Sequence, residues 1–147
     1  EIGSHSYNHS NLAKISAADV KKEMNDTDKL IKKITGSKAT LMRPPYGSIG
    51  DVTKKNVGKP MILWSIDTLD WKTRNTQKTI DAVMKNVKDG DIVLMHDIHE
   101  PTKDAALQII PKLKKQGYQL VTVSELAKYR GYKLEKGVSY RTMYKKK

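Results

Sequence analysis

Two histidines near the start of the sequence have the spacing of a pair of metal ligands. His5 and His9 are separated by three residues in the segment HSYNH, and two imidazoles four positions apart can reach one point in space. Because the chain has no cysteine, a metal here has to take histidine and carboxylate ligands. Such a pair alone is more often a chance arrangement or part of a helix surface. The interpretation therefore depends on the other residues that the fold brings to this place.

The hydrophobic pattern predicts alternating strands and helices, and hence an α/β fold with a parallel sheet, open or closed into a barrel. Continuous apolar runs are typical of strands buried on both faces, and Ser, Thr and Gly mark the helix ends. The predicted strands are residues 39–42, 60–66, 91–95 and 118–123. The predicted helices are residues 16–36, 49–57, 76–90, 103–116 and 124–130. Pro111 predicts a kink or a later start in the fourth helix.

Polar and aromatic side chains gather directly after the predicted strands. In parallel sheets the chemistry lies at the C-terminal ends of the strands, so these residues are candidates for a site. All four histidines belong to two of the four clusters. The clusters are His5 and His9; Arg43 and Tyr46; Asp67, Asp70 and Trp71; and His96, Asp97 and His99.

Each cluster alone also has an ordinary structural explanation. Arg43 could form a surface ion pair in a rigid turn, Trp71 could be part of the core, and Asp70 could cap a loop. His96, which follows five strand residues, could be a buried histidine with satisfied hydrogen bonds. The joint pattern is what favours a functional site.

Four ordered segments, HSYNH, RPPYG, DTLDW and LMHDIH, closely resemble motifs of the polysaccharide deacetylase family. This family is also called the NodB homology domain or carbohydrate esterase family 4. The resemblance is strongest to its peptidoglycan N-acetylglucosamine deacetylases from Gram-positive bacteria. It implies a distorted (β/α) barrel that removes acetyl groups from sugar polymers with one divalent metal, for which zinc is expected. We expect residues 1–131 to be the C-terminal major part of such a domain, and residues 132–147 a polar basic tail without regular structure.

The resemblance also implies roles for individual residues. His5 and His9 would be metal ligands, and Arg43 would orient the catalytic aspartate. The RPPYG turn would place the backbone N–H of Tyr46 at the oxyanion. Asp70 would keep His96 protonated near neutral pH, so that His96 acts as the general acid. The wall of the acetyl-methyl pocket would consist of Trp71 and Leu94.

One motif of the family, a TFDD run that ends the first strand, is absent from this sequence. The resemblance assigns the catalytic base and the third metal ligand to that run, and no Asp-Asp pair occurs in the chain. We therefore expect an N-terminal segment of the same domain to supply both carboxylates. Two imidazoles alone bind a metal weakly, so we expect the chain by itself to be inactive.

The motifs do not fix the substrate. An N-acetylated polysaccharide is expected, and chitin, poly-N-acetylglucosamine and acetylxylan are alternatives to peptidoglycan. A non-catalytic carbohydrate-binding relative is another alternative, although a binding protein needs no general acid. The net charge of +12 comes mainly from lysine and favours attraction to a polyanion such as an anionic cell wall. The resemblance implies a location outside the cell or at the surface of a Gram-positive bacterium. We expect neither nucleic-acid binding nor a transmembrane segment.

Overall fold

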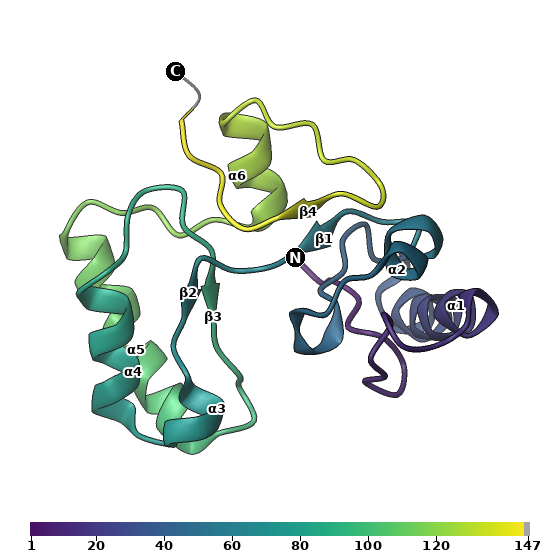
Figure 1. Ribbon diagram of the computed structural model, residues 1–147. Coiled ribbons are helices and arrows are strands. Elements are labelled where there is room, and N and C mark those ends of the chain that lie inside the picture. The colour runs from purple at the N-terminus through teal and green to yellow at the C-terminus, as the bar shows by residue number, and fades with distance from the viewer. Residues whose placement is uncertain (146–147) are drawn as a thin grey trace. The chain divides into compact units, whose positions relative to one another are not determined.

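The computed structural model describes residues 1–145 as two compact units. The first unit comprises Glu1–Leu63 with Lys133–Tyr140, and the second comprises Trp64–Tyr132 with the residues that follow from Arg141. Both units combine helices with two-stranded parallel sheets, as the α/β prediction requires. Their elements are shown in Figure 1.

The first unit contains two helices, a short 3₁₀ turn and one parallel strand pair. Helix α1 (Ala17–Thr35) begins at Ser16, whose side chain accepts a hydrogen bond from the Asp19 N–H, and ends at Gly36 in the left-handed conformation. The shorter elements are the 3₁₀ turn Pro45–Gly47, α2 (Asp51–Asn56), β1 (Met61–Ile62) and β4 (Ser139–Tyr140). The core of this unit is formed by Leu12, Val20, Met24, Met42, Val57 and Met61.

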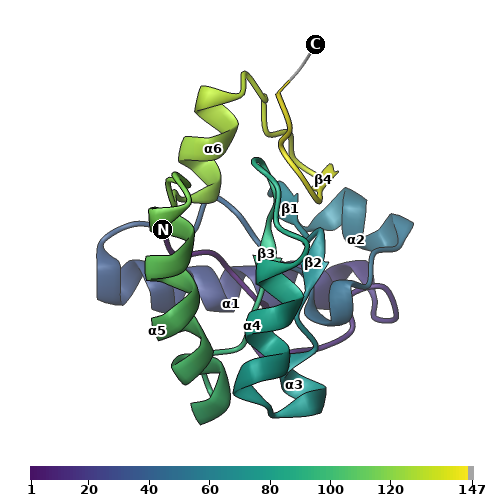
Figure 2. The same cartoon turned by 90° about the vertical axis from the view of Figure 1, so that its left-hand side faces the viewer.

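The second unit packs two long helices beside a strand pair. Figure 2 shows α4 (Thr76–Met84) and α5 (Glu100–Lys115) side by side, near β2 (Ile66–Asp67) and β3 (Val93–Leu94). The remaining helices are α3 (Asp70–Thr73) and α6 (Val123–Tyr129). The core of this unit is formed by Ile80, Val83, Ala105, Ile109 and Leu113.

Several predicted boundaries are wrong. The apolar run 60–66 is not one strand but two, because Met61–Ile62 pairs with β4 while Ile66–Asp67 pairs with β3. Residues 118–122 form no strand, and among residues 1–145 no strand pairs with them. An apolar run becomes a strand only where a neighbouring backbone supplies hydrogen bonds.

The ends of α4 and α5 also differ from the prediction. Asn75, not Thr76, caps α4, because the Asn75 side chain accepts the Lys78 N–H. Helix α5 starts before residue 103, at Glu100, and continues through Pro111. A proline removes the hydrogen bond to the carbonyl four residues earlier. That carbonyl belongs to Leu107, which is exposed to water.

The expectation that no regular structure follows Gly131 is wrong at β4, which pairs in parallel with β1. The chain turns at Gly137, whose φ of +77° suits a residue without a side chain. Its N–H donates to the Lys59 carbonyl, and a Cβ at this position would collide with the Lys54 carbonyl oxygen. Of the basic run at the C-terminus, residues 146 and 147 lie outside the described residues.

We predict that Gly137→Ala destabilises the protein more than Gly36→Ala. Both glycines have positive φ, but nothing lies within 4 Å of a Cβ at Gly36. Gly36→Ala therefore adds only backbone strain, whereas Gly137→Ala adds a collision with α2, which should cost about 2 kcal/mol more. Denaturant unfolding of the two variants measures the difference. Equal losses would contradict the packing of residues 133–140 against α2.

Candidate metal and acid-base sites

The segment that carries His5 is held beside Arg43 by parallel backbone pairing. The Ser4 N–H donates to the Leu41 carbonyl at 2.9 Å, and the Arg43 N–H donates to the Ser4 carbonyl at 2.8 Å. Ser4 and Met42 thus form a parallel bridge, and Met42 forms another with Met61. The predicted convergence of the first two clusters is therefore present in the first unit.

His5 has the hydrogen bond that a metal-ligating histidine usually makes through its second ring nitrogen. Its Nδ1 lies 2.5 Å from the carbonyl oxygen of Arg43. A carbonyl can only accept, so Nδ1 carries the proton and the lone pair is on Nε2. Backbone carbonyls often orient metal-bound imidazoles in this way.

The His9 ring lies between those of His5 and Tyr46. The ring centroids of His5 and His9 are 4.9 Å apart, and those of His9 and Tyr46 are 4.7 Å apart, both with edge-to-face geometry. Tyr46 belongs to the RPPYG turn, has a φ of 61°, and leaves 68% of its surface exposed. The first unit therefore brings together the predicted metal ligands and the turn that was predicted to bind the oxyanion.

The second unit brings together Asp70 and His96. Asp70 opens α3 and is 1% exposed, and His96 follows β3. The His96 Nδ1 lies 2.8 Å from Asp70 Oδ1, and the His96 backbone N–H donates to Asp70 Oδ2 at 2.6 Å. Because Nδ1 faces the carboxylate, any proton that His96 exchanges with a substrate must be carried on Nε2.

The N-terminal turn of α5 holds the same carboxylate. Thr102, which is buried, donates its hydroxyl to Asp70 Oδ2 at 2.9 Å.

Arg74 lies close to His99, with Nη1 2.7 Å from His99 Nδ1. A guanidinium can only donate, so this nitrogen of His99 carries a lone pair. His99, whose role the sequence left undecided, has its ring beside Arg74 and occupies the N-cap position of α5 without a side-chain capping hydrogen bond.

The pKa of Asp70 results from opposing effects. Burial alone would raise it, but the hydrogen bonds from the His96 ring, the His96 N–H and Thr102 outweigh burial. The net pKa of Asp70 is below its ordinary value. The carboxylate is therefore ionised at neutral pH and can stabilise a positive charge on His96.

Trp71 and Leu94 lie between the two members of this pair along the chain, Trp71 directly after Asp70 and Leu94 two residues before His96. Leu94 is the last residue of β3 and is buried, and its carbonyl accepts the hydroxyl of buried Thr68 at 2.8 Å. Trp71 follows Asp70 in α3 and is 48% exposed, so it is not a core residue. An exposed indole and a buried leucine are compatible with the predicted pocket wall, which stays a prediction.

The described part of the chain holds no complete metal site. Among residues 1–145, no three His, Asp or Glu side chains form a group that could hold a metal ion. The residues present are compatible with two positions of such a site, because the His5 and His9 rings are neighbours and the Nδ1 contact of His5 is of the kind that metal-ligating histidines make.

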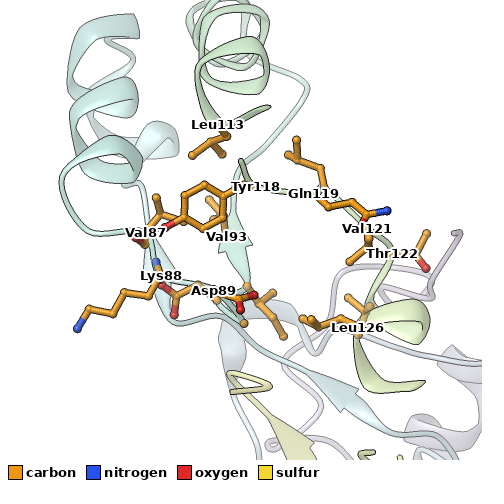
Figure 3. Close-up of a pocket in the computed structure, with 15 residues that line it drawn as sticks. Val87, Lys88, Asp89, Val93, Leu113, Tyr118, Gln119, Val121, Thr122 and Leu126 are labelled. Carbon is orange, nitrogen blue, oxygen red and sulfur yellow. Dashed lines mark hydrogen bonds between the residues drawn. The ribbon is translucent and has the colours of Figure 1, made fainter. Parts of the chain in front are cut away.

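The hollow in the second unit shown in Figure 3 has a volume of 320 Å³ and lies away from these residues. It is surrounded mainly by apolar side chains, among them Val93, Leu113, Tyr118 and Leu126. Its lining includes residues that precede and begin β3, whereas His96 follows the end of that strand. None of the predicted site residues lines it, so we assign it no catalytic role.

Sequence reasoning missed three residues that hold the site: Glu23, Arg74 and Thr102. Glu23 had a detectable signal, because it lies on the same helix face as Val20 and Met24. A carboxylate on an apolar face must have buried partners. Thr102 and Arg74 gave no comparable signal, since their partners are distant in sequence.

Comparison with known proteins places the chain in a family. The sequence profile described as polysaccharide deacetylase matches residues 1–62. The peptidoglycan-N-acetylmuramic acid deacetylase PdaC of Bacillus subtilis is 46% identical over 126 residues, which are 86% of this chain and 27% of that protein. The peptidoglycan-N-acetylglucosamine deacetylase PgdA of Listeria monocytogenes is 42% identical over 140 residues, which are 95% of this chain and 29% of that protein. This chain therefore spans less than a third of either relative.

A solved structure supports the same assignment. The family 4 acetyl xylan esterase of Clostridium thermocellum, in complex with a cobalt ion, is 31% identical and superposes with a TM-score of 0.91. The match covers 97% of this chain and 72% of the esterase chain. The chain belongs to the polysaccharide deacetylase family, and the fold expected from its four motifs is confirmed.

We predict that Asp70 stabilises the fold at neutral pH and that acid removes this contribution. Its folded pKa is lowered, so the stabilisation is present above the unfolded value of about 3.9 and is lost as the pH falls through the folded value. At pH 7, Asp70→Asn should lower the free energy of unfolding by about 1–3 kcal/mol, since hydrogen bonds to a buried charged group are lost. Denaturant unfolding at pH 7 and pH 3 measures the effect. A difference between wild type and variant that does not shrink in acid would contradict this explanation.

Proposed function

We propose that this chain is part of a metal-dependent hydrolase that removes acetyl groups from N-acetylglucosamine residues of peptidoglycan. The observation that carries the proposal is how the candidate histidines are held. The ring Nδ1 of His5 and that of His96 each face an oxygen acceptor, which fixes the tautomer and the orientation of each ring. The similarity to peptidoglycan deacetylases of Gram-positive bacteria supports the substrate class.

The chemistry needs two kinds of histidine. When bound, a divalent metal such as zinc polarises the acetamide carbonyl and lowers the pKa of a water molecule. In the proposal, His5 and His9 hold this metal. His96 gives the proton on its Nε2 to the leaving nitrogen, because an amine leaves poorly as an anion. Asp70 stabilises the protonated ring that delivers it.

The remaining predicted residues have supporting roles in this proposal. The backbone N–H of Tyr46 would donate to the oxyanion that forms from the acetamide carbonyl. Arg43 would orient the catalytic base, and Trp71 and Leu94 would form the wall beside the acetyl methyl group. The left-handed conformation of Tyr46 supports a special role for the RPPYG turn, because strained backbone is concentrated at functional sites.

We also propose that the catalytic base and the third metal ligand lie in an N-terminal segment of the same domain. Residues 1–145 contain no third metal-ligating side chain beside His5 and His9. The esterase with bound cobalt extends beyond the part that this chain matches. Without such a segment, the chain would have an acid but no base.

The same proposal places the protein at the outer surface of a Gram-positive cell. Its formal net charge of +12 would attract it to an anionic wall. None of the helices within residues 1–145 has the length and apolar character needed to cross a bilayer.

We predict that His96→Ala and His5→Ala fail in different ways in the intact protein. His96→Ala should lower kcat by about 10²–10⁴-fold, because a general acid is removed, and should keep the metal. His5→Ala should lose both activity and metal. Acetate release from N-acetylglucosamine oligomers gives kcat, and elemental analysis gives the metal content. Loss of metal from His96→Ala would overturn the assigned roles.

The substrate is tested in the same assay. Acetate release from N-acetylglucosamine oligomers and peptidoglycan, abolished by a chelator, is the expected result. Release only from N-acetylmuramic acid, chitin, poly-N-acetylglucosamine or acetylxylan would replace the proposed substrate. Sugar binding without acetate release from any of them would favour a non-catalytic carbohydrate-binding protein.

A further inference from the structure

Glu23 is a nearly buried carboxylate on α1, with 8% of its surface exposed. It shares a helix face with Val20 and Met24, which belong to the core of the first unit. An ionised carboxylate is unfavourable in such a place unless hydrogen-bond donors surround it. The hydrogen-bond donors to Glu23 therefore indicate its structural role.

The HSYNH loop supplies the donors. Glu23 Oε2 accepts hydrogen bonds from the backbone N–H groups of Tyr7 and Asn8, both at 2.8 Å. The other oxygen, Oε1, accepts from the Asn8 side-chain amide, also at 2.8 Å. Hydrogen bonds to a charged acceptor are stronger than neutral ones. Both oxygens of Glu23 are thus directed at the two residues in the middle of the HSYNH loop.

The loop that Glu23 holds is strained. Ser6 and His9 have φ values of 66° and 56°, which place both in the left-handed region. A residue with a Cβ in such a conformation costs of order 1–3 kcal/mol and persists only where the surroundings fix it. Ser6 and His9 flank the two residues that Glu23 binds. Without Glu23, we expect the loop to relax toward ordinary conformations.

We propose that Glu23 is a positioning residue for metal binding: it holds the HSYNH loop in the strained form that brings the His5 and His9 rings together. This inference rests on the proposed function, in which these two rings bind the metal. The centroids of the two rings lie 4.9 Å apart. A loop fixed in advance loses little conformational freedom on binding, so the metal is bound more tightly.

The ionisation of Glu23 agrees with this role. Burial alone would raise its pKa, but the hydrogen bonds from Asn8 and Tyr7 more than offset burial, and the net pKa of Glu23 is below its ordinary value. The carboxylate is therefore charged throughout the neutral range, where all three hydrogen bonds are made.

Four variants of the intact protein distinguish three effects on zinc binding: loss of the hydrogen bonds to the loop, loss of the Glu23 charge, and a change in the stability of α1. Glu23→Ala removes the three hydrogen bonds. Glu23→Gln removes the charge, but its single oxygen can accept both backbone N–H groups while Asn8 turns its amide oxygen toward the new NH₂. Asn8→Ala removes one hydrogen bond from the loop side. The matched control is Asp26→Ala, on the same helix, where the ion-pair partners of Asp26 among residues 1–145 are the exposed Lys22 and Lys29.

Two measurements are made on each variant after circular dichroism shows that it is folded. Zinc affinity is measured by competition with a chromophoric chelator. Hydrogen exchange of the Tyr7 and Asn8 amides is measured in the metal-free protein. Glu23→Ala should bind zinc about 10–100-fold more weakly, as partners of metal ligands typically do, and exchange both amides faster. Glu23→Gln should stay within about threefold of wild type, Asn8→Ala should lie between the two, and Asp26→Ala should equal wild type.

If folded Glu23→Ala binds zinc as tightly as wild type, the inference is overturned, whatever the exchange rates of the two amides. Unchanged exchange of the Tyr7 and Asn8 amides in this variant would overturn it as well. If Glu23→Ala does not fold, the zinc affinity of Asn8→Ala tests the inference instead. A wild-type zinc affinity in Asn8→Ala then overturns it. His5→Ala and His9→Ala are titrated alongside. Zinc binding that survives both would instead overturn the metal site of the proposed function, and the inference with it.

Discussion

The parallel register of three short backbone segments is the constraint on which the rest of the first site depends. Ser4 pairs with Met42, and Met42 pairs with Met61, so three segments distant in sequence end at the same edge. Each pairing is only one residue long, yet its register determines which residues lie next to one another just after the paired positions. His5 therefore lies beside Arg43, and the RPPYG turn begins next to the HSYNH loop. In the second unit, the pairing of β2 with β3 does the same for Asp70 and His96.

Both sites use the same device to prepare a histidine. An oxygen acceptor binds Nδ1, which fixes the tautomer, the plane of the ring and the direction of Nε2. The acceptor differs with the task. His5 faces the neutral carbonyl of Arg43, which would orient the proposed metal ligand without adding charge. His96 faces the ionised carboxylate of Asp70, which fixes the Nδ1 side of the ring, as the proposed general acid requires. In the proposed function, the same residue type would thus supply a metal ligand in one unit and a proton donor in the other.

The sequence indicated which polar residues lie together within each unit better than it indicated the strands that support them. Polar residues that directly follow apolar runs are recognisable in a sequence, and the order of the motifs that contain them is specific. This is why the sequence identified four candidates: His5, His9, Asp70 and His96. The apolar run 60–66 could not be divided correctly, because its two halves differ only in their distant partners, β4 and β3. Residues 118–122 have the composition of a strand, but hydropathy does not reveal whether a neighbouring backbone is present. The role of Glu23 became clear only from its contacts with the loop.

The central claim is that the chain presents His5 and His9 as metal ligands and His96 as a proton donor. The most direct test is ¹⁵N NMR of the imidazole rings in the intact protein, recorded before and during zinc addition. The account predicts that metal-free His5 carries its proton on Nδ1, and that zinc shifts His5 Nε2 and one nitrogen of His9 while the His96 ring keeps its bond to Asp70. A proton on His5 Nε2 in the metal-free protein, or zinc binding at His96 in place of His5 and His9, would contradict it.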